Sequence, residues 1–330
     1  MRTVVLHPGA LGDVLLAIPA VRALRAGAPD HEVVLAAQPR IGRLLAALEV
    51  VDRPLDFDTL GLDALFTTHE PAGHLRQLLE GARVVSWFAS RDAHFTHRLR
   101  SLAAEGVIAP SVPVEPLTVW EHLLGSVAPL ATGGASDAAW REPIALRADV
   151  VETGRRALLA AGWDGGRPLV ILHPGAGGVA KRWAVEGFAL AAEAVANASG
   201  AVADAFGAQI VVHEGPADRD AVARLHDRLR VPACALVDPP LETLAGALHH
   251  ATLFLGNDSG VTHLAAAVGA PTLALFAAAN LAWRPWASGA HVRVVTMGAL
   301  ARPDVDTVIE DAGGLLRSRD LRAVGIRGRR

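Results

Sequence analysis

Hydrophobic positions along the chain fall into short continuous runs separated by longer amphipathic stretches. In the first half, runs typical of buried strands occur at residues 1–6, 32–37, 50–57 and 82–88. The stretches between and after them carry apolar residues at helical spacing and predict helices at residues 14–25, 41–48, 60–80 and 117–130. Pro19 is expected to kink the first of these helices. This alternation predicts an α/β fold, with a parallel sheet covered by helices on both faces.

The second half repeats this order. Strands are expected at residues 168–173, 209–213 and 233–237, and helices at residues 151–161, 184–197, 217–229 and after Pro303. The sequence His-Pro-Gly-Ala follows the first strand at His7 and returns at His173, about half a chain later. The repeat predicts two domains with Rossmann-like parallel sheets, residues 1–150 and 151–330, joined through the small-residue segment 131–149.

Residues 252–276 form the most informative stretch, with the order strand, loop, helix, strand. Ser259 is a candidate N-cap, and Gly269 is suited to the end of the helix. A capped helix start attracts anions, phosphate above all, and places Asp258 in the same loop. His263, one turn along, is expected to help hold the anion. The competing interpretation is that Asp258 and Ser259 only cap the helix and that His263 is a surface residue.

Composition limits the classes of function. The chain has 330 residues, of which 51% are hydrophobic and 20% charged, so it can bury two cores. Its net charge of −3 argues against general nucleic-acid binding. The single cysteine, Cys234, excludes a disulfide framework and a cysteine-based zinc site. No apolar run has membrane-spanning length and no signal-peptide pattern opens the chain, so a cytoplasmic location is expected.

Lysine is almost absent from the sequence. Lys181 is the only lysine among 31 basic residues, and it follows a glycine-rich turn that contains Gly175, Gly177 and Gly178. The spacing is not that of a P-loop. Backbone N–H groups and a compact ammonium nevertheless suit a diphosphate. The sequence therefore predicts that these four residues bind a phosphorylated ligand.

Asp13 follows Gly12 at the start of the first helix. One interpretation is a first-turn carboxylate favoured by the helix dipole, and the other is a general base. In open α/β sheets ligands bind at the carboxyl ends of the strands. Asp13, Lys181 and Asp258 all follow predicted strands, so we expect them to lie along one cleft between the two sheets.

Several motifs point away from metal and nicotinamide chemistry. Three Asp-x-Asp triplets, at residues 56–58, 218–220 and 304–306, have the form that holds Mg²⁺ on sugar nucleotides, but they lie outside the glycine turns. Neither glycine turn matches the G-x-G-x-x-G fingerprint of nicotinamide enzymes. The sequence therefore predicts a site without metal or cofactor, in which Lys181 and the helix start at Ser259 supply the positive potential.

Three motifs together resemble the ADP-heptose:lipopolysaccharide heptosyltransferase family, glycosyltransferase family 9. They are residues 11–24 (Leu-Gly-Asp-Val-Leu-Leu), residues 173–183 (His-Pro-Gly-Ala to Lys-Arg-Trp) and residues 256–266 (Gly-Asn-Asp-Ser-Gly-Val-Thr-His). The resemblance implies a GT-B fold, with the acceptor bound by the first domain and the nucleotide sugar by the second.

The resemblance also implies roles for single residues. Asp13 would be the catalytic base on the acceptor side, next to Gly12, and Lys181 would contact the donor. Asp258 would hold sugar hydroxyls. The remaining donor-binding residues would be Gly175, Gly177, Gly178, Ser259, Gly260 and His263.

These features predict an inverting, metal-independent glycosyltransferase that moves a sugar, heptose from ADP-heptose, to a hydroxyl of a glycan or lipopolysaccharide-core acceptor. Contact with the inner face of the membrane is expected to be peripheral at most. Two alternatives stay open: a catalytically silent nucleotide-sugar binding protein, and another GT-B enzyme such as a sugar-nucleotide epimerase.

Overall fold

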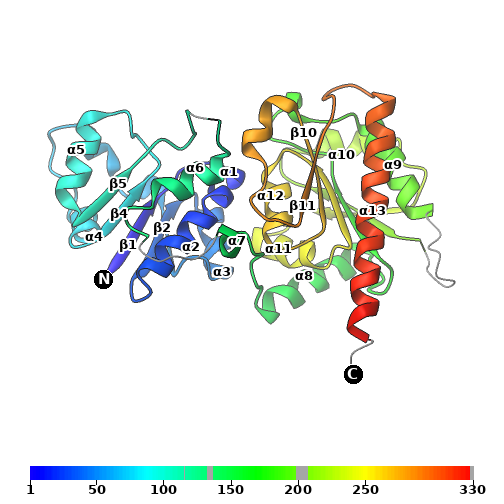
Figure 1. Ribbon diagram of the computed structural model, residues 1–330, viewed down its shortest axis with the longest axis horizontal. Helices are drawn as coiled ribbons and strands as arrows, with labels where there is room; N and C mark the ends of the chain where they lie inside the picture. The colour runs from blue at the N-terminus through cyan, green and yellow to red at the C-terminus, as the bar shows by residue number, and fades with distance from the viewer. Residues whose placement is uncertain (115, 132–136, 198–206, 328–330) are drawn as a thin grey trace. The chain divides into compact units, whose positions relative to one another are not determined.

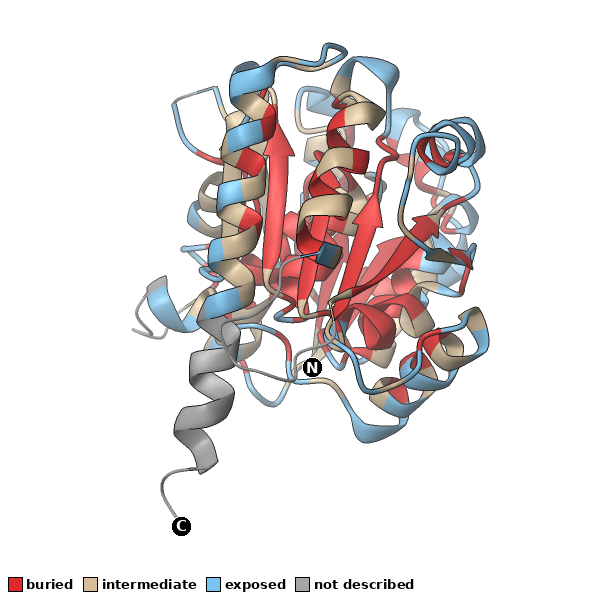
Figure 2. Cartoon of the chain, turned by 90° about the vertical axis from the view of Figure 1, so that its right-hand side faces the viewer, coloured by how far each residue is buried: buried red, intermediate tan, exposed pale blue. Residues whose placement is uncertain are grey.

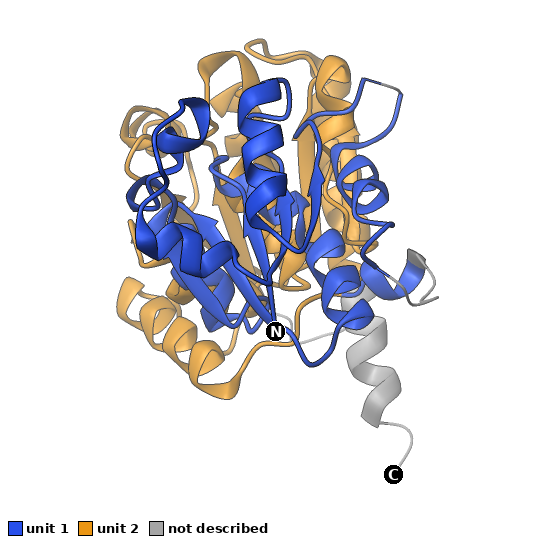
Figure 3. Cartoon of the chain, turned by 90° about the vertical axis from the view of Figure 1, so that its left-hand side faces the viewer, with its two compact units in different colours: residues 1–142 blue, residues 143–330 orange. Residues whose placement is uncertain are grey.

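The computed structural model describes residues 1–114, 116–131, 137–197 and 207–327, of which 137 and 318–327 are described by their backbone alone. The chain divides into two compact units, Met1–Glu142 (unit 1) and Pro143–Arg330 (unit 2), shown in separate colours in Figure 3. The predicted linker glycines Gly133 and Gly134 lie outside the described residues.

Unit 1 contains a five-stranded parallel sheet with the order β3-β2-β1-β4-β5 (Figure 1). Its central strand β1 pairs with β2 and β4, so that Val5 lies opposite Leu35 and Val85. The strands are β1 (Arg2–Leu6), β2 (Glu32–Ala37), β3 (Arg53–Asp56), β4 (Arg83–Ser86) and β5 (Glu105–Ile108). The helices are α1 (Leu11–Leu16), α2 (Ile18–Gly27), α3 (Pro39–Ala47), α4 (Gly73–Leu79), α5 (Ala93–Leu102), α6 (Val119–Ser126) and α7 (Asp137–Trp140), with 3₁₀ turns η1 (Phe57–Thr59) and η2 (Leu62–Phe66).

Unit 2 contains a six-stranded parallel sheet with the order β11-β10-β9-β6-β7-β8. Its strands are β6 (Leu169–His173), β7 (Gln209–Glu214), β8 (Ala233–Val237), β9 (Leu253–Asn257), β10 (Thr272–Phe276) and β11 (Ala290–Val294). Its helices are α8 (Ala148–Ala161), α9 (Val185–Asn197), α10 (Arg219–His226), α11 (Leu241–His249), α12 (Gly260–Ala267) and α13 (Arg302–Arg327), with 3₁₀ turns η3 (Val179–Lys181) and η4 (Ala278–Trp283).

Both sheets have the strand order of a Rossmann fold. In each unit the first three strands extend the sheet in one direction, and the chain then returns to the other side of the first strand. The predicted fold class, two Rossmann-like parallel-sheet domains, is confirmed. The central strands are buried on both faces, as Figure 2 shows for unit 2. They are continuous apolar runs because helices cover the sheet on both sides.

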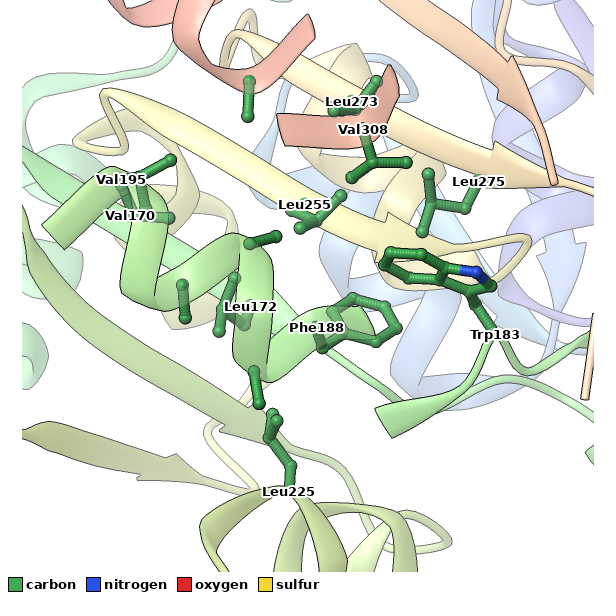
Figure 4. Close-up of a cluster of buried hydrophobic side chains, with 14 of the residues drawn as sticks. Val170, Leu172, Trp183, Phe188, Val195, Leu225, Leu255, Leu273, Leu275 and Val308 are labelled. Carbon is green, nitrogen blue, oxygen red and sulfur yellow. The ribbon is translucent and has the colours of Figure 1, made fainter. Parts of the chain in front are cut away.

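The core of unit 2 forms where α9 and α13 pack on one face of its sheet. Leu172, Leu255 and Leu275 come from three neighbouring strands and contact Phe188 and Trp183 (Figure 4). A corresponding cluster in unit 1 joins β1, β2 and β4 to α4, α5 and η2. Two separate cores match two separately organised sheets.

The division between the units falls at Glu142, before the boundary at 150 that the sequence suggested. The helix α8 packs closely on α11: a Cβ atom on Gly154 would lie 2.0 Å from the backbone carbon of Gly246. The preceding Ile144 donates its N–H to the carbonyl of Ala267 at 2.8 Å. These contacts attach residues 143–150 to the second sheet.

Several elements differ from those predicted. The expected helix at residues 60–80 is replaced by η2 and the short α4, because Gly61 adopts φ +72° and Pro71 separates the two. The expected kink at Pro19 is a complete break: α1 ends at Leu16 and α2 begins at Ile18. Among the described residues no helix is long and apolar enough to cross a membrane.

Candidate functional site

The candidate site lies at the carboxyl edge of the unit 2 sheet, between β6 and β9. These strands are adjacent, and the chain order reverses between them. Loops that leave two such strands in opposite directions open a crevice, which is the usual ligand position in doubly wound sheets. The glycine turn and Lys181 follow β6, and Asp258 and Ser259 follow β9.

Lys181 and Asp258 form an ion pair at this edge of the sheet. The Lys181 Nζ atom lies 2.9 Å from Asp258 Oδ2, and Asn280 Nδ2 donates to the same oxygen at 2.9 Å. The side chain of Asp258 is 4% exposed, whereas that of Lys181 is 41% exposed. The Lys181 ammonium is therefore accessible to solvent, whereas the Asp258 carboxylate beside it is buried. Asn280, which lies in η4 after β10, was not anticipated from the sequence.

The start of α12 has the predicted capped geometry. Ser259 is the N-cap, and its Oγ accepts a hydrogen bond from the Thr262 N–H at 3.3 Å. Within the described part of the chain, the N–H groups of Gly260 and Val261 have no hydrogen-bond partner. Two free donors at a helix N-terminus, beside Lys181, make a site for an anion.

His263 is buried, so the alternative that treats it as a surface residue is wrong. Its pKa is lowered to about 4, chiefly by burial; Asp258 opposes the shift and Lys181 contributes to it. The imidazole is therefore neutral near pH 7 and does not add positive charge to the site. Its buried Nδ1 has no hydrogen-bond partner among the described residues.

Asn257 links the loop after β6 to the end of β9 by hydrogen bonds. It is fully buried at the end of β9, and its Oδ1 accepts the Trp183 N–H at 2.9 Å. Its Nδ2 donates to the carbonyls of Pro174 and Gly175 at 2.9 and 3.4 Å. The sequence pattern did not predict a role for this residue, although a buried amide between two loops fixes both.

The glycine turn packs against the buried carboxylate of Asp218. Asp218, just before α10, accepts the Gly215 N–H at 3.2 Å, and a Cβ atom on Gly175 would lie 2.0 Å from its Oδ1. Gly177 and Gly178 are exposed, with no atom within 4 Å of an added Cβ. Gly175 is thus required by packing, whereas the other two leave the backbone open to a ligand.

A pair of histidines lies beneath the same turn. His173 and His213 are buried at the ends of β6 and β7, with their Nδ1 atoms 3.0 Å apart. Burial lowers the pKa of both, so one neutral ring donates to the other. Glu214 ends β7, the strand whose final acidic residue binds ribose hydroxyls in Rossmann folds. That topological rule could have singled out Glu214, which sequence analysis did not name.

Asp13 lies in unit 1, in the first turn of α1 after β1. Its Oδ2 accepts the Ala10 N–H at 3.2 Å. The same unit holds a cavity of about 260 Å³ at the carboxyl ends of β4 and β5, lined in part by Trp87, Arg91 and Ser111. The structure therefore places Asp13 and Gly12 at the loop edge of the first sheet, and Lys181 with Asp258 at that of the second.

The Asp-x-Asp triplets have local partners. Asp56 accepts the Asp58 N–H at 3.1 Å, and Asp304 accepts the Thr296 N–H at 2.7 Å. The remaining triplet, residues 218–220, begins with Asp218, which packs against Gly175 of the glycine turn. Within the described ranges, no three His, Cys, Asp or Glu side chains are grouped so that they could hold a metal ion.

Residues 145–307, which include Lys181, Asp258 and Asn280, match glycosyltransferase family 9 (heptosyltransferase). The match covers just under half of the chain and shows that this segment is similar to the family. One relative, lipopolysaccharide heptosyltransferase 3 of Escherichia coli, is 32% identical over 133 residues, which are 37% of this chain and 35% of that protein. The matched segment thus spans about a third of the length of this curated relative.

Solved structures extend the similarity to both units of the chain. The glycosyl transferase family 9 protein of Veillonella parvula has a TM-score of 0.74 at 17% identity and covers 96% of this chain and 97% of its own. The ADP-heptose LPS heptosyltransferase II of E. coli has a TM-score of 0.72 at 18% identity and covers 97% and 100%. At these identities the likeness concerns the fold, and it confirms the predicted GT-B type.

Proposed function

We propose that the protein is an inverting glycosyltransferase that transfers a sugar from a nucleotide diphosphate, ADP-heptose, to a hydroxyl of a glycan or lipopolysaccharide-core acceptor. The observation that carries this proposal is the Lys181–Asp258–Asn280 cluster beside the free N–H groups of α12, within the segment that matches the family. The names of two similar proteins, a lipopolysaccharide heptosyltransferase and an ADP-heptose heptosyltransferase, support this donor and acceptor class.

In the donor half of this mechanism, the diphosphate lies over the glycine turn and the start of α12. Gly177 and Gly178 admit the phosphates to the backbone, and Gly260 offers a free N–H at the helix N-terminus. Lys181 neutralises the charge that develops as the bond from the anomeric carbon to the phosphate oxygen breaks. Asp258 uses one oxygen for Lys181 and Asn280 and offers the other to sugar hydroxyls.

In the acceptor half, Asp13 removes the proton of the acceptor hydroxyl while that oxygen attacks the anomeric carbon. The new glycosidic bond forms on the face opposite the departing ADP, so the anomeric configuration inverts. A positioned base contributes about 10²–10⁴-fold to such a step. The cavity beside Trp87 and Arg91 is the part of unit 1 in which we expect the acceptor to bind. Action on a lipid-linked acceptor would place the protein at the inner face of the membrane.

The experiment that tests this function is an ADP-release assay with ADP-heptose and a lipopolysaccharide-core acceptor, preceded by a thermal-shift comparison of ADP, UDP, GDP and CDP. Release of ADP only when acceptor is present, with the product anomer determined by NMR, supports the proposal. Tight donor binding without transfer to any acceptor would instead favour a silent nucleotide-sugar binding protein. A donor preference for UDP would contradict the proposed nucleotide.

The same assay tests metal independence. We expect transfer to persist in excess EDTA, because Lys181 and the helix N-terminus supply the positive potential that Mg²⁺ provides in other enzymes of nucleotide sugars. Asp56→Ala is expected to leave donor affinity unchanged, since this carboxylate caps its own turn. Activity that disappears with the chelator and returns with Mg²⁺ or Mn²⁺ would contradict this part of the mechanism.

A further inference from the structure

Unit 2 also contains a cavity, of about 380 Å³, beside the segment that follows Lys181. We call it the arginine cavity, because three arginine side chains line it. They come from the segment before α9, from α10 and from the residues just after α10. Its lining residues include Val179, Arg182, Trp183, Glu186, Arg224 and Arg228. None of the groups assigned above to the sugar donor lines this cavity.

The positive charge of the arginine cavity is only partly compensated. Arg228 lies 3.7 Å from the Glu186 carboxylate. Arg182 donates to the carbonyl of Ala217 at 3.5 Å, and Arg224 donates to the carbonyl of Asp220 at 3.2 Å. Among the described residues, no carboxylate lies within salt-bridge distance of Arg182 or Arg224. Asp227 is the other acidic residue in the lining, so the cavity carries a net positive charge.

Two residues in the cavity lining each carry a buried nitrogen atom without a hydrogen-bond partner. The Nε atom of Arg182 and the Nε1 atom of Trp183 are buried and have no hydrogen-bond partner within the described ranges. Trp183 is 1% exposed; its benzene ring packs in the unit 2 core, and the nitrogen lies on the side of the ring away from Leu172 (Figure 4). Buried donors without acceptors are rare in proteins, and an incoming acceptor is one way to satisfy them.

We propose that the arginine cavity binds a phosphomonoester, a phosphate group carrying a small organic substituent. Guanidinium groups pair with phosphate in bidentate geometry, and three of them offer more donors than the two oxygens of a carboxylate can accept. The volume is within the range of small-molecule sites and exceeds what a bare phosphate fills. Val179 and Val185 supply apolar surface for the substituent.

Occupation of this cavity is expected to act on the donor site, because the two share a segment. Arg182 directly follows Lys181, and its carbonyl accepts the Gly298 N–H at 2.9 Å. A ligand that holds Arg182 also restricts Lys181, so it raises the affinity for the donor, and the donor raises the affinity for the ligand by the same factor. Binding to the cavity itself does not depend on the proposed transferase activity.

Calorimetric titration of the full chain with glycerol 3-phosphate at low ionic strength tests the proposal, with inorganic phosphate and glycerol as companion probes. Substitution of both Arg224→Gln and Arg228→Gln is expected to weaken glycerol 3-phosphate about tenfold or more, since two charge-assisted contacts are lost. Arg230→Gln removes an exposed charge just beyond α10, outside the cavity lining, and should leave the affinity unchanged. Lys181→Ala should still bind the probe.

Other results would overturn the proposal. Binding that survives in the double variant but disappears in Lys181→Ala would place the probe in the donor site. Equal affinities for inorganic phosphate and glycerol 3-phosphate would contradict a role for the apolar wall, and no binding to the unsubstituted protein would contradict the site altogether. If the double variant fails to fold, the charge-reversing Arg224→Glu alone must abolish binding. Because no transfer is measured, these outcomes are separate from those of the ADP-release assay.

Discussion

Substitution of Lys181 is the most discriminating test of the donor site. The side chain makes one compact contact, from Nζ to Asp258 Oδ2 at 2.9 Å, and Asn280 shares that oxygen. In Lys181→Met the stem is kept and the charge is lost. In Lys181→Arg the charge is kept, but a guanidinium fork tends to take both carboxylate oxygens. That geometry would displace Asn280 and leave Asp258 no oxygen for a sugar hydroxyl.

The magnitudes follow from the exposure of the two partners. Lys181 is 41% exposed and its charge is screened, so its loss should lower the free energy of unfolding by only about 1 kcal/mol. Its proposed contact with the donor phosphate is a charge-assisted hydrogen bond, worth about 1.5–3 kcal/mol. Both Lys181→Met and Lys181→Arg should therefore reduce kcat/KM by about 10–150-fold.

The assay combines steady-state kinetics, calorimetric donor binding and chemical denaturation for both variants, with Arg230→Gln as a control for the loss of an exposed charge. We expect the unfolding midpoints to change little and donor affinity to fall in both Lys181 variants. Native kinetics in Lys181→Arg would refute the argument, because they would show that any cation at this position suffices. Large destabilisation with normal donor affinity would show that Lys181 only compensates the buried Asp258.

Three further predictions concern other parts of the site. Gly175→Ala places a Cβ atom 2.0 Å from Asp218 Oδ1 and should lower the free energy of unfolding by about 1–3 kcal/mol, whereas Gly177→Ala, which meets nothing within 4 Å, should leave the urea midpoint unchanged. Burial lowers the pKa of His263 to about 4 from 6.5, so unfolding takes up a proton between these values. Stability should therefore fall as the pH drops through this window, less steeply in His263→Asn than in the unsubstituted protein; equal slopes in urea denaturation would contradict it. Asp13→Asn should reduce kcat about 10²–10⁴-fold while calorimetric donor affinity stays unchanged, and retention of more than about a tenth of kcat would show that Asp13 only stabilises its helix.

The central part of the fold could be predicted because its strands are continuous apolar runs. β1, β6 and β9 lie between helices on both sides, so nearly every position is hydrophobic. β5 and β11 could not be predicted in this way. They are half-exposed edge strands, and β11 carries His291 and Arg293 among its five residues, which hides the strand pattern.

The candidate site could be predicted only in part from the sequence. Lys181 and Asp258 could be brought together in advance, because loops that follow adjacent parallel strands meet at one edge. Asn280 lies 22 residues beyond Asp258, in a turn without a recognisable motif, so its hydrogen bond to Asp258 could be found only from the structure. The charge state of His263 also needed it, because burial determines that pKa and no local pattern reports burial.

The single lysine has a chemical consequence. Lys181 carries the only side-chain primary amine of the protein, and its ammonium is accessible to solvent in the crevice between β6 and β9. An acylating reagent selective for amines would therefore modify no other side chain of the protein. A fluorophore attached in this manner would lie within the crevice itself, and its attachment would be slowed by any ligand that covers Lys181. Covalent chemistry could thus map occupancy of the proposed donor site in the unsubstituted protein.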